Sequence, residues 1–237
     1  MKQSQRLQQI DRMVTRHYNH IFDCCCDHGF LGQALLQRNI ADTVHFVDVV
    51  EPIMAELQDQ LERLYGTGYP RNSWQVQCQD VAALSLPKDG STLVIIAGVG
   101  GDLLIDLVTA LVSAHPDRSL EFILCPVYHN YKVRQALREL SLSLIDEQLV
   151  HENRQSYEVL HLASSATDIE AEPISPVGKR MWDLSKTEHQ QYLDRTIAHY
   201  ERMSQRRESA VGSTSAEDIV AQYKALRLPR PLKPEKC

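Results

Sequence analysis

The sequence predicts an α/β fold in which a mostly parallel, doubly wound sheet ends in an antiparallel hairpin and is followed by an α-helical hairpin. Three observations lead to this prediction. Short apolar runs alternate with helical patterns over residues 1 to about 165. Two strand-like runs, Ser143–His151 and Tyr157–Ala163, then stand close enough for an antiparallel hairpin. Beyond a small, acidic, proline-containing segment, apolar residues recur at spacings of four and three, as an amphipathic helix needs.

Hydrophobic spacing and turn residues place the individual elements. Apolar residues that recur on one helical face mark the helices, as Val133, Leu137 and Leu140 do, whereas short apolar runs bounded by turn residues mark the strands. In chain order we expect a helix at about 4–16, a strand at Ile21–Cys24, a helix at about Gly29–Arg38, a strand at Val44–Val49, a helix at about Glu51–Tyr65, strands at Trp74–Cys78 and Thr92–Ala97, a helix at about Asp102–Ala114, a strand at Phe122–Pro126 and a helix at Tyr131–Leu140.

The second half of the chain changes character after the sheet. In the expected helical hairpin, Leu193, Ile197 and Tyr200 share one helical face, and Ser215 stands three residues before Asp218 as a helix cap would. The predicted regions are a domain over 1–165, a linker over 166–177, a helical hairpin over 178–228 and a disordered, proline-rich tail over 229–237.

Composition and charge narrow the class of protein. The 237 residues, 43% hydrophobic and 24% charged, suit a soluble protein with one sizeable domain and an appendage. There is no apolar run near the roughly 20 residues that span a bilayer, and the amino terminus lacks the apolar core of a secretory signal. Six cysteines, three of them adjacent at Cys24–Cys26, do not form the spaced framework of a disulfide-rich protein. We therefore expect a cytoplasmic protein with reduced thiols.

The charge is unevenly distributed along the chain. From Gly178 onward there are 12 lysines and arginines against 8 acidic residues, so the tail carries about +4 and the body about −10 of the formal charge of −6. A basic tail could favour binding to a polyanion. A solvated basic helix without a partner explains the same pattern.

The plan of the sheet narrows the function. A parallel sheet that finishes with an antiparallel hairpin is the Rossmann-like plan of class I methyltransferases, whereas dinucleotide oxidoreductases usually finish with further parallel strands. The alternative interpretation, a nicotinamide oxidoreductase, is less favoured because the first loop, Asp23–Gly29, lacks the Gly-x-Gly-x-x-Gly motif. We therefore expect this loop to bind S-adenosylmethionine.

Acidic residues and glycines follow the predicted strands, where open α/β sheets bind ligands. Asp23 closes the first strand, Gly29 opens the next helix, and Asp48 ends the second strand, where an acidic residue can take ribose hydroxyls. Asp80 follows the third strand and could meet an adenine amino group. The run Ala97–Gly101 follows the fourth strand, and its three glycines allow the backbone to approach a ligand. A tight turn, close helix packing and a helix cap are the alternatives for Gly29 and Asp48.

Two loop motifs point to a specific family. The loops Asp23–His28 and Ala97–Gly101, together with the helical hairpin, resemble the bacterial tRNA (adenine-N1)-methyltransferases that modify adenine 22. In that family the two loops read Asp-x-Gly-x-Asp-His and Ala-Gly-Met-Gly-Gly. Cys25, Val99 and Val127 stand where that family has glycine, methionine and asparagine, which leaves open a divergent substrate or a fold retained without activity. The matching positions are Asp23, Asp27, His28, Ala97, Gly98, Gly100, Gly101, Pro126, His129, Arg134 and Tyr157–Leu160.

The resemblance implies S-adenosyl-L-methionine as the cofactor, tRNA as the substrate, no metal and no membrane partner, and a monomer is the favoured state. It implies Asp27 and His28 as catalytic residues. The cofactor-binding residues expected from the fold and the resemblance are Asp23, Cys25, Gly29, Asp48, Val49, Asp80, Val81, Ala97, Gly98, Val99 and Gly100. The base-binding or tRNA-binding residues expected are Gly101, His129, Tyr157, Arg202, Arg206 and Arg207.

Adenine N1 attacks through a ring lone pair, so positioning should matter more than a general base. Asp27 is expected to accept from the exocyclic amine or to favour the growing positive charge, with His28 orienting it or the cofactor. A helix N-cap is the alternative role for Asp27. Binding of RNA or cofactor without transfer is a second hypothesis. A metal site of Cys24–Cys26 and His28 is disfavoured, because adjacent strand residues point to opposite faces.

Overall fold

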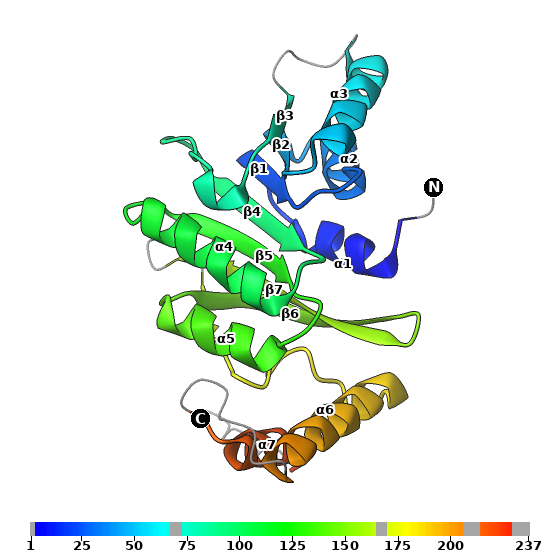
Figure 1. Ribbon diagram of the computed structural model, residues 1–237, viewed down its shortest axis with the longest axis vertical. Helices are drawn as coiled ribbons and strands as arrows, with labels where there is room; N and C mark the ends of the chain where they lie inside the picture. The colour runs from blue at the N-terminus through cyan, green and yellow to red at the C-terminus, as the bar shows by residue number, and fades with distance from the viewer. Residues whose placement is uncertain (1–2, 67–72, 165–169, 206–213, 229–237) are drawn as a thin grey trace, which may run out of the picture. The chain divides into compact units, whose positions relative to one another are not determined.

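The computed structural model describes the chain apart from residues 1–2, 67–72, 165–169, 206–213 and 229–237 (Figure 1). The predicted disordered tail lies outside the described residues. The chain divides into two compact units, Met1–Met181 and Trp182–Cys237. The four region boundaries drawn from the sequence stay predictions.

The first unit alternates helices and strands, as the sequence predicts (Figure 1). Its described elements are α1 (Gln5–Met13), β1 (Tyr18–Cys24), α2 (Phe30–Gln37), β2 (Ala41–Asp48), α3 (Glu51–Tyr65), β3 (Trp74–Cys78), the 3-10 helix η1 (Val81–Ala83), β4 (Thr92–Ala97), α4 (Gly101–Ala114), β5 (Leu120–Cys125), α5 (Asn130–Glu139), β6 (Ser143–Glu152), β7 (Gln155–Ala163) and β8 (Glu172–Pro173).

The described strands form one sheet in the order β3-β2-β1-β4-β5-β7-β6-β8. The strands β3, β2, β1, β4 and β5 pair in parallel, β7 runs antiparallel to β5, and β6 pairs antiparallel with β7. This arrangement confirms the predicted fold class. The short strand β8 was not predicted. It lies inside the region expected to be a linker and pairs with Ser143 and Leu144 of β6. Two residues are too few to show the period of a strand.

Apolar side chains of the central strand β4 are buried on both faces of the sheet. Leu93 and Ile95 belong to a core with residues of α1 and α2, whereas Val94 and Ile96 belong to a core with residues of α4 and α5. The helix α3 packs with α2 and β2 in a third cluster. A continuous apolar run is the expected pattern of a parallel strand covered by helices on both faces. Polar side chains therefore collect in the loops at the carboxyl ends of β1, β2 and β4.

A buried charge cluster joins α5 to the last strands. Arg134 lies between Glu147 of β6 and Glu158 of β7, with nitrogen–oxygen distances of 2.8 and 2.7 Å, and all three side chains are at most 1% exposed. Arg134 also donates to the carbonyl oxygen of Ser175 at 3.1 Å, and Glu147 accepts the backbone N–H of Lys179. The carboxylates hold the pKa of Arg134 above its usual value despite burial. The cluster therefore fixes the segment that follows β8 to the sheet.

The second unit is a helical hairpin of α6 (Thr187–Gln205) and α7 (Ala216–Ala225), which confirms that part of the predicted fold class. Lys224 pairs with Glu201 at 2.7 Å, and Arg227 pairs with Asp194, so the two helices run antiparallel. Ser215 accepts the backbone N–H three residues ahead at 3.1 Å and caps α7 as predicted. The buried residues between the helices include Leu193, Ile197, Tyr200, Ile219 and Tyr223.

Candidate functional site

The loop between β1 and α2 passes through three left-handed residues. The angle φ is +55° at Cys25, +51° at Asp27 and +66° at Gly29. A residue with a side chain adopts this conformation at a cost of roughly 1–2 kcal/mol. The loop therefore keeps at Cys25 the backbone conformation that favours glycine, although the glycine itself is replaced.

Asp23 lies buried at the carboxyl end of β1. Its side-chain Oδ2 accepts the backbone N–H of Gly32 at 2.8 Å, and the residue is 4% exposed. Burial raises the pKa of Asp23 to about 7, and the nearby charge of Asp48 raises it further, whereas the hydrogen bond from Gly32 lowers it. This carboxyl group therefore changes its charge near neutral pH.

Two glycines allow α2 to lie close to β2. A Cβ atom at Gly29 would lie 2.9 Å from side-chain atoms of Leu57 and Phe46, and one at Gly32 would lie 2.3 Å from the ring of Phe46. Gly29 is also the left-handed N-cap of α2. The structure thus gives Gly29 the tight turn and close packing that were the alternatives to cofactor binding. A cofactor contact of Gly29 stays a prediction.

Asp48 connects the loops that follow β1 and β2. One carboxylate oxygen accepts the backbone N–H of Asp27 at 3.1 Å, and the other accepts those of Val49 at 2.8 Å and Val50 at 3.2 Å. The side chain of Val49 is 63% exposed. Asp48 is therefore held at the edge of the loop, where remaining lone pairs could still accept from ribose hydroxyls.

Asp80 and Val81 follow β3. Asp80 caps η1 by accepting the backbone N–H of Ala82 at 2.9 Å. Val81 is 3% exposed and packs in the core beside α4. The side chain of Val81 is thus directed into the core, so a cofactor contact at this position would have to use its backbone.

The glycines after β4 serve two different purposes. A Cβ atom at Gly98 would meet only the guanidinium group of Arg6, at 3.4 Å, whereas one at Gly100 would lie 2.3 Å from the hydroxyl oxygen of Tyr128. A Cβ atom at Gly101 would lie 2.6 Å from the backbone oxygen of Tyr128. Gly100 and Gly101 therefore let the loop after β5 pack against the loop after β4. The backbone hydrogen bond from Val127 to the oxygen of Val99, at 2.9 Å, joins the same two loops.

Asp27 and His28 lie side by side at the surface of the site. Oδ1 of Asp27 is 3.6 Å from Nε2 of His28, and their side chains are 69% and 51% exposed. The N-cap of α2 is Gly29 and no side chain caps that helix. The alternative role of Asp27 as a helix N-cap is therefore wrong, and its carboxylate is available to a ligand.

The predicted base-binding residues with described positions lie on different elements. His129 is the N-cap of α5 with φ of +65°, and its Nδ1 lies 3.3 Å from Asp102, which also accepts from Lys132 at 2.7 Å. Tyr157, on β7, lies beneath the guanidinium group of Arg6 at 5.0 Å from its ring centre. Arg202 lies exposed on α6 of the second unit, and Arg206 and Arg207 lie outside the described residues.

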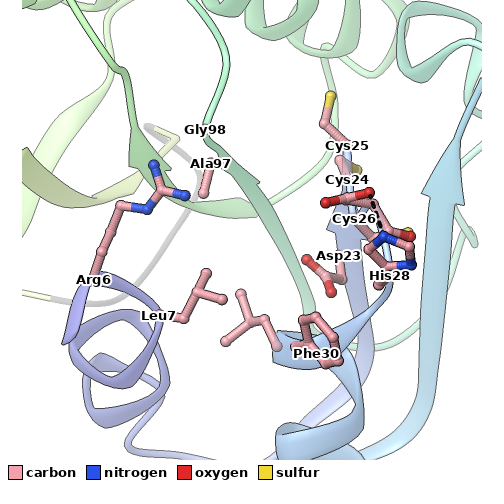
Figure 2. A pocket seen from close by; sticks show the side chains of 12 residues that line it. Arg6, Leu7, Asp23, Cys24, Cys25, Cys26, His28, Phe30, Ala97 and Gly98 are labelled. Carbon is pink, nitrogen blue, oxygen red and sulfur yellow. Dashed lines mark hydrogen bonds and ion pairs between the residues drawn. The ribbon is translucent and has the colours of Figure 1, made fainter. Parts of the chain in front are cut away.

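A pocket opens at the carboxyl ends of β1 and β4 and has a volume of about 180 Å³. Figure 2 shows the guanidinium group of Arg6 beside Ala97 and Gly98, with Asp23, the cysteines and His28 across from it. The lining residues are Arg6, Leu7, Asp23, Cys24, Cys25, Cys26, Asp27, His28, Phe30, Leu31, Ala97 and Gly98. Thus six of the predicted site residues share the pocket: Asp23, Cys25, Asp27, His28, Ala97 and Gly98.

Sequence reasoning missed the contribution of α1 to this pocket. Arg6 and Leu7 come from the first helix, whose pattern indicates only an amphipathic surface, and Phe30 and Leu31 come from the start of α2. The spacing of residues along the chain does not reveal the position of Arg6, because α1 is brought to the pocket by its packing against α2, β6 and β7.

Electrostatics in the pocket act against thiol chemistry. Burial raises the pKa of Cys25 to about 11, and burial likewise raises the pKa of Cys26. Among the described residues there is no group of three or more histidine, cysteine or acidic side chains that could hold a metal ion. None of the helices in the described parts of the chain is both long enough and apolar enough to cross a membrane.

The family model that describes a methyltransferase domain matches residues 3–160, which include α1, the whole pocket and most of the sheet. The chain belongs to this methyltransferase family. The matched residues contain all twelve that line the pocket, so the pocket of this methyltransferase is part of the family domain. The helical hairpin lies beyond the matched residues.

Solved structures resemble both units of the methyltransferase. A Streptococcus pneumoniae protein, a proposed tRNA (m1A22) methyltransferase in complex with S-adenosyl-L-methionine, has a TM-score of 0.73 at 18% identity over 95% of this chain and 99% of its own. The B. subtilis m1A22 tRNA methyltransferase TrmK has a TM-score of 0.67 at 18% identity over 95% of both chains. The M. capricolum TrmK in complex with S-adenosyl-homocysteine has a TM-score of 0.71 at 13% identity, over 95% of this chain and 98% of its own. At these identities the likeness shows the fold. Comparison with curated proteins found no match.

Proposed function

We propose that this methyltransferase transfers the methyl group of S-adenosyl-L-methionine to N1 of an adenine in tRNA, at position 22 by family resemblance. One observation carries the proposal: proteins named as tRNA (m1A22) methyltransferases match the chain over nearly the full length of both, including the helical hairpin. The reaction is expected to take place in the cytoplasm.

The pocket residues fit the amino-acid end of this cofactor. A volume of about 180 Å³ is below the roughly 300 Å³ of the smallest sites for drug-sized ligands, so it suits one end of the cofactor rather than the whole molecule. Asp23 offers a carboxylate to the cofactor's positive charges. Gly98 lets the guanidinium group of Arg6 lie beside the backbone at its side of the pocket. The thiol of Cys25 is compatible with a positively charged ligand because it is uncharged at neutral pH.

Cofactor affinity is expected to depend on pH through Asp23. Because burial raises the pKa of Asp23 to about 7, the carboxyl group must lose a proton to pair with a cationic ligand. Affinity should therefore rise as pH increases from about 6 to 8, and the dissociation constant should fall by up to about tenfold per pH unit below the pKa. Calorimetric titrations with S-adenosylmethionine at several pH values measure this slope.

The Asp23→Asn variant is the control for this prediction. It keeps the shape of the side chain but has no proton to lose, so its affinity should be lower and independent of pH over the same window. The exposed Asp89→Asn variant should keep the wild-type slope. A slope that survives in Asp23→Asn would assign the titration to another group.

The chain's own residues can position the target base. The cofactor supplies an electrophilic methyl group when bound, and adenine N1 attacks it through a ring lone pair, so no base has to remove a proton first. Asp27, which is exposed and lies 3.6 Å from His28, can accept from the exocyclic amine and stabilise the positive charge that grows on the ring. His28 orients that carboxylate. The base must leave its stack to reach them, because N1 lies on the Watson–Crick edge.

The helical hairpin is proposed to hold the tRNA backbone. The triple substitution of Arg202, Arg206 and Arg207 by glutamine should raise the dissociation constant for tRNA and lower the steepness of its salt dependence by about two to three units of the logarithmic slope, since each phosphate contact contributes roughly 0.7–0.9. Filter binding at several salt concentrations measures both quantities. Cofactor affinity serves as the internal control and should not change. Unchanged tRNA binding would remove the hairpin from the tRNA site.

The decisive test is the chemical identity of the product. Unmodified tRNA is incubated with the protein and S-adenosylmethionine labelled on its methyl group, and the nucleosides are analysed by mass spectrometry. Labelled 1-methyladenosine is expected, and it should disappear when adenine 22 is replaced. Label in another nucleoside would refute the adenine-N1 assignment. Cofactor binding without any transfer would support the alternative of a binding protein, for which Cys25 in place of the family glycine is the motivating observation.

A further inference from the structure

Arg6 lines the pocket, and no carboxylate of the described residues forms an ion pair with it. It is the second residue of α1, half-buried, and its guanidinium group reaches the side of the pocket formed by Ala97 and Gly98 (Figure 2). One guanidinium nitrogen lies 3.4 Å from the place that a Cβ atom at Gly98 would take. The acidic side chains that line the pocket, Asp23 and Asp27, belong to the β1–α2 region across from it.

The described contacts of Arg6 leave its donors available. Within the part of the chain that the structure describes, its guanidinium group forms no hydrogen bond or ion pair, and the guanidinium carbon lies 5.0 Å from the centre of the Tyr157 ring. A ring below the guanidinium plane leaves the N–H groups around its edge free to donate to a planar anion. Tyr157 thus orients Arg6 toward the pocket rather than neutralising it.

The helix that carries Arg6 is fixed by other residues. Ser4 caps α1 by accepting the backbone N–H of Leu7 at 3.2 Å, and Glu152 of β6 accepts the backbone N–H of Gln5 at 2.8 Å. Ile10 and Met13 are buried in the core beneath the helix. Because these contacts anchor α1, the fold does not need the charge of Arg6, and the position of that charge in the pocket calls for a ligand.

We propose that Arg6 forms an anion subsite that binds the α-carboxylate of the methyl-donor cofactor, an inference that rests on the proposed function. The amino-acid end of that cofactor carries one ammonium and one carboxylate group, and the pocket offers acidic side chains on one side and the guanidinium group of Arg6 on the other. Asp23 pairs with the ammonium group and Arg6 pairs with the carboxylate. Two N–H groups of a guanidinium can donate to the two oxygens of one carboxylate. The small volume of the pocket suits this end of the ligand.

The test compares two ligands that differ only in the carboxylate. Wild-type protein, Arg6→Gln and Arg6→Lys are titrated calorimetrically, without tRNA, with S-adenosylmethionine and with decarboxylated S-adenosylmethionine. In the wild type, the complete cofactor should bind about 10–100-fold more tightly than the decarboxylated one. In Arg6→Gln, affinity for the complete cofactor should fall by that factor and affinity for the decarboxylated one should not change. Arg6→Lys should keep part of the preference.

Arg12→Gln is the matched control, because Arg12 lies exposed on the same helix. It should retain the full preference for the carboxylated ligand. An equal loss of affinity for both ligands in Arg6→Gln would show that Arg6 has a structural role and would overturn the proposal. Unchanged affinity for both ligands, with weaker tRNA binding, would instead make Arg6 a phosphate contact and overturn it equally. If the wild type binds neither ligand, the proposed function itself fails; if the preference is present but no tRNA is methylated, only the substrate assignment fails.

Discussion

Replacing Arg134 by methionine is expected to lower the free energy of unfolding by about 3–5 kcal/mol. The substitution keeps much of the side-chain volume but leaves Glu147 and Glu158 buried, at most 1% exposed, without their cation. Two adjacent carboxylates in a low-dielectric interior must then either stay charged at high cost or take up a proton. Urea denaturation followed by circular dichroism measures the loss.

Two further variants make this prediction specific. Arg138→Met changes a neighbouring residue of α5 that is exposed, and its unfolding free energy should change by less than about 0.5 kcal/mol. Adding Glu147→Gln and Glu158→Gln to Arg134→Met should restore part of the lost stability, because the uncompensated charges are removed. A loss below about 1 kcal/mol in Arg134→Met would mean that the carboxylates find other partners.

Asp27→Asn is expected to lower the rate constant of methyl transfer by about 10²-fold with cofactor affinity unchanged. The amide keeps the size of the side chain, but it loses the negative charge that stabilises the positive ring. Because the Asp27 side chain is 69% exposed and caps no helix, the fold does not depend on it. Single-turnover kinetics with tRNA, with calorimetry for the cofactor, separate the two effects.

Asp89→Asn provides the matched comparison, since it removes one exposed carboxylate outside the pocket and should leave the rate constant unchanged. His28→Gln should produce a smaller loss than Asp27→Asn if its role is to orient the carboxylate. A rate constant for Asp27→Asn within about twofold of the wild type would falsify the role assigned to this residue.

The sequence predicted the sheet well because local signals agreed with burial. The run Leu93–Ala97 is apolar throughout, and in the structure it belongs to the central strand β4, which is covered on both faces. The sequence pattern did not predict an element that is very short, or the end of an element where the end is set by contacts with other parts of the fold. The helix expected at 4–16 ends at Met13, where Val14 leaves the helical conformation, and β8 has only two residues, held by pairing with β6.

The candidate site was predictable only where its residues are close in sequence. The motif around Asp27 identified one wall of the pocket, and the run after β4 identified another. Arg6 was missed because its approach to Gly98 depends on how α1 packs against β6 and β7. Likewise, the sequence could not distinguish Gly98, which lies beside the guanidinium group of Arg6, from Gly100, which makes room for Tyr128. These differences arise from packing between loops of different strands.

The three adjacent cysteines have a consequence for how this protein tolerates oxidising conditions. With the pKa of Cys25 raised to about 11, the fraction of this thiol present as thiolate near pH 7 is on the order of one in ten thousand. Peroxides and alkylating agents attack the thiolate, so Cys25 should react far more slowly than an ordinary surface cysteine. Burial raises the pKa of its neighbours Cys24 and Cys26 as well. The pocket thus combines a sulfur-rich wall with low chemical reactivity.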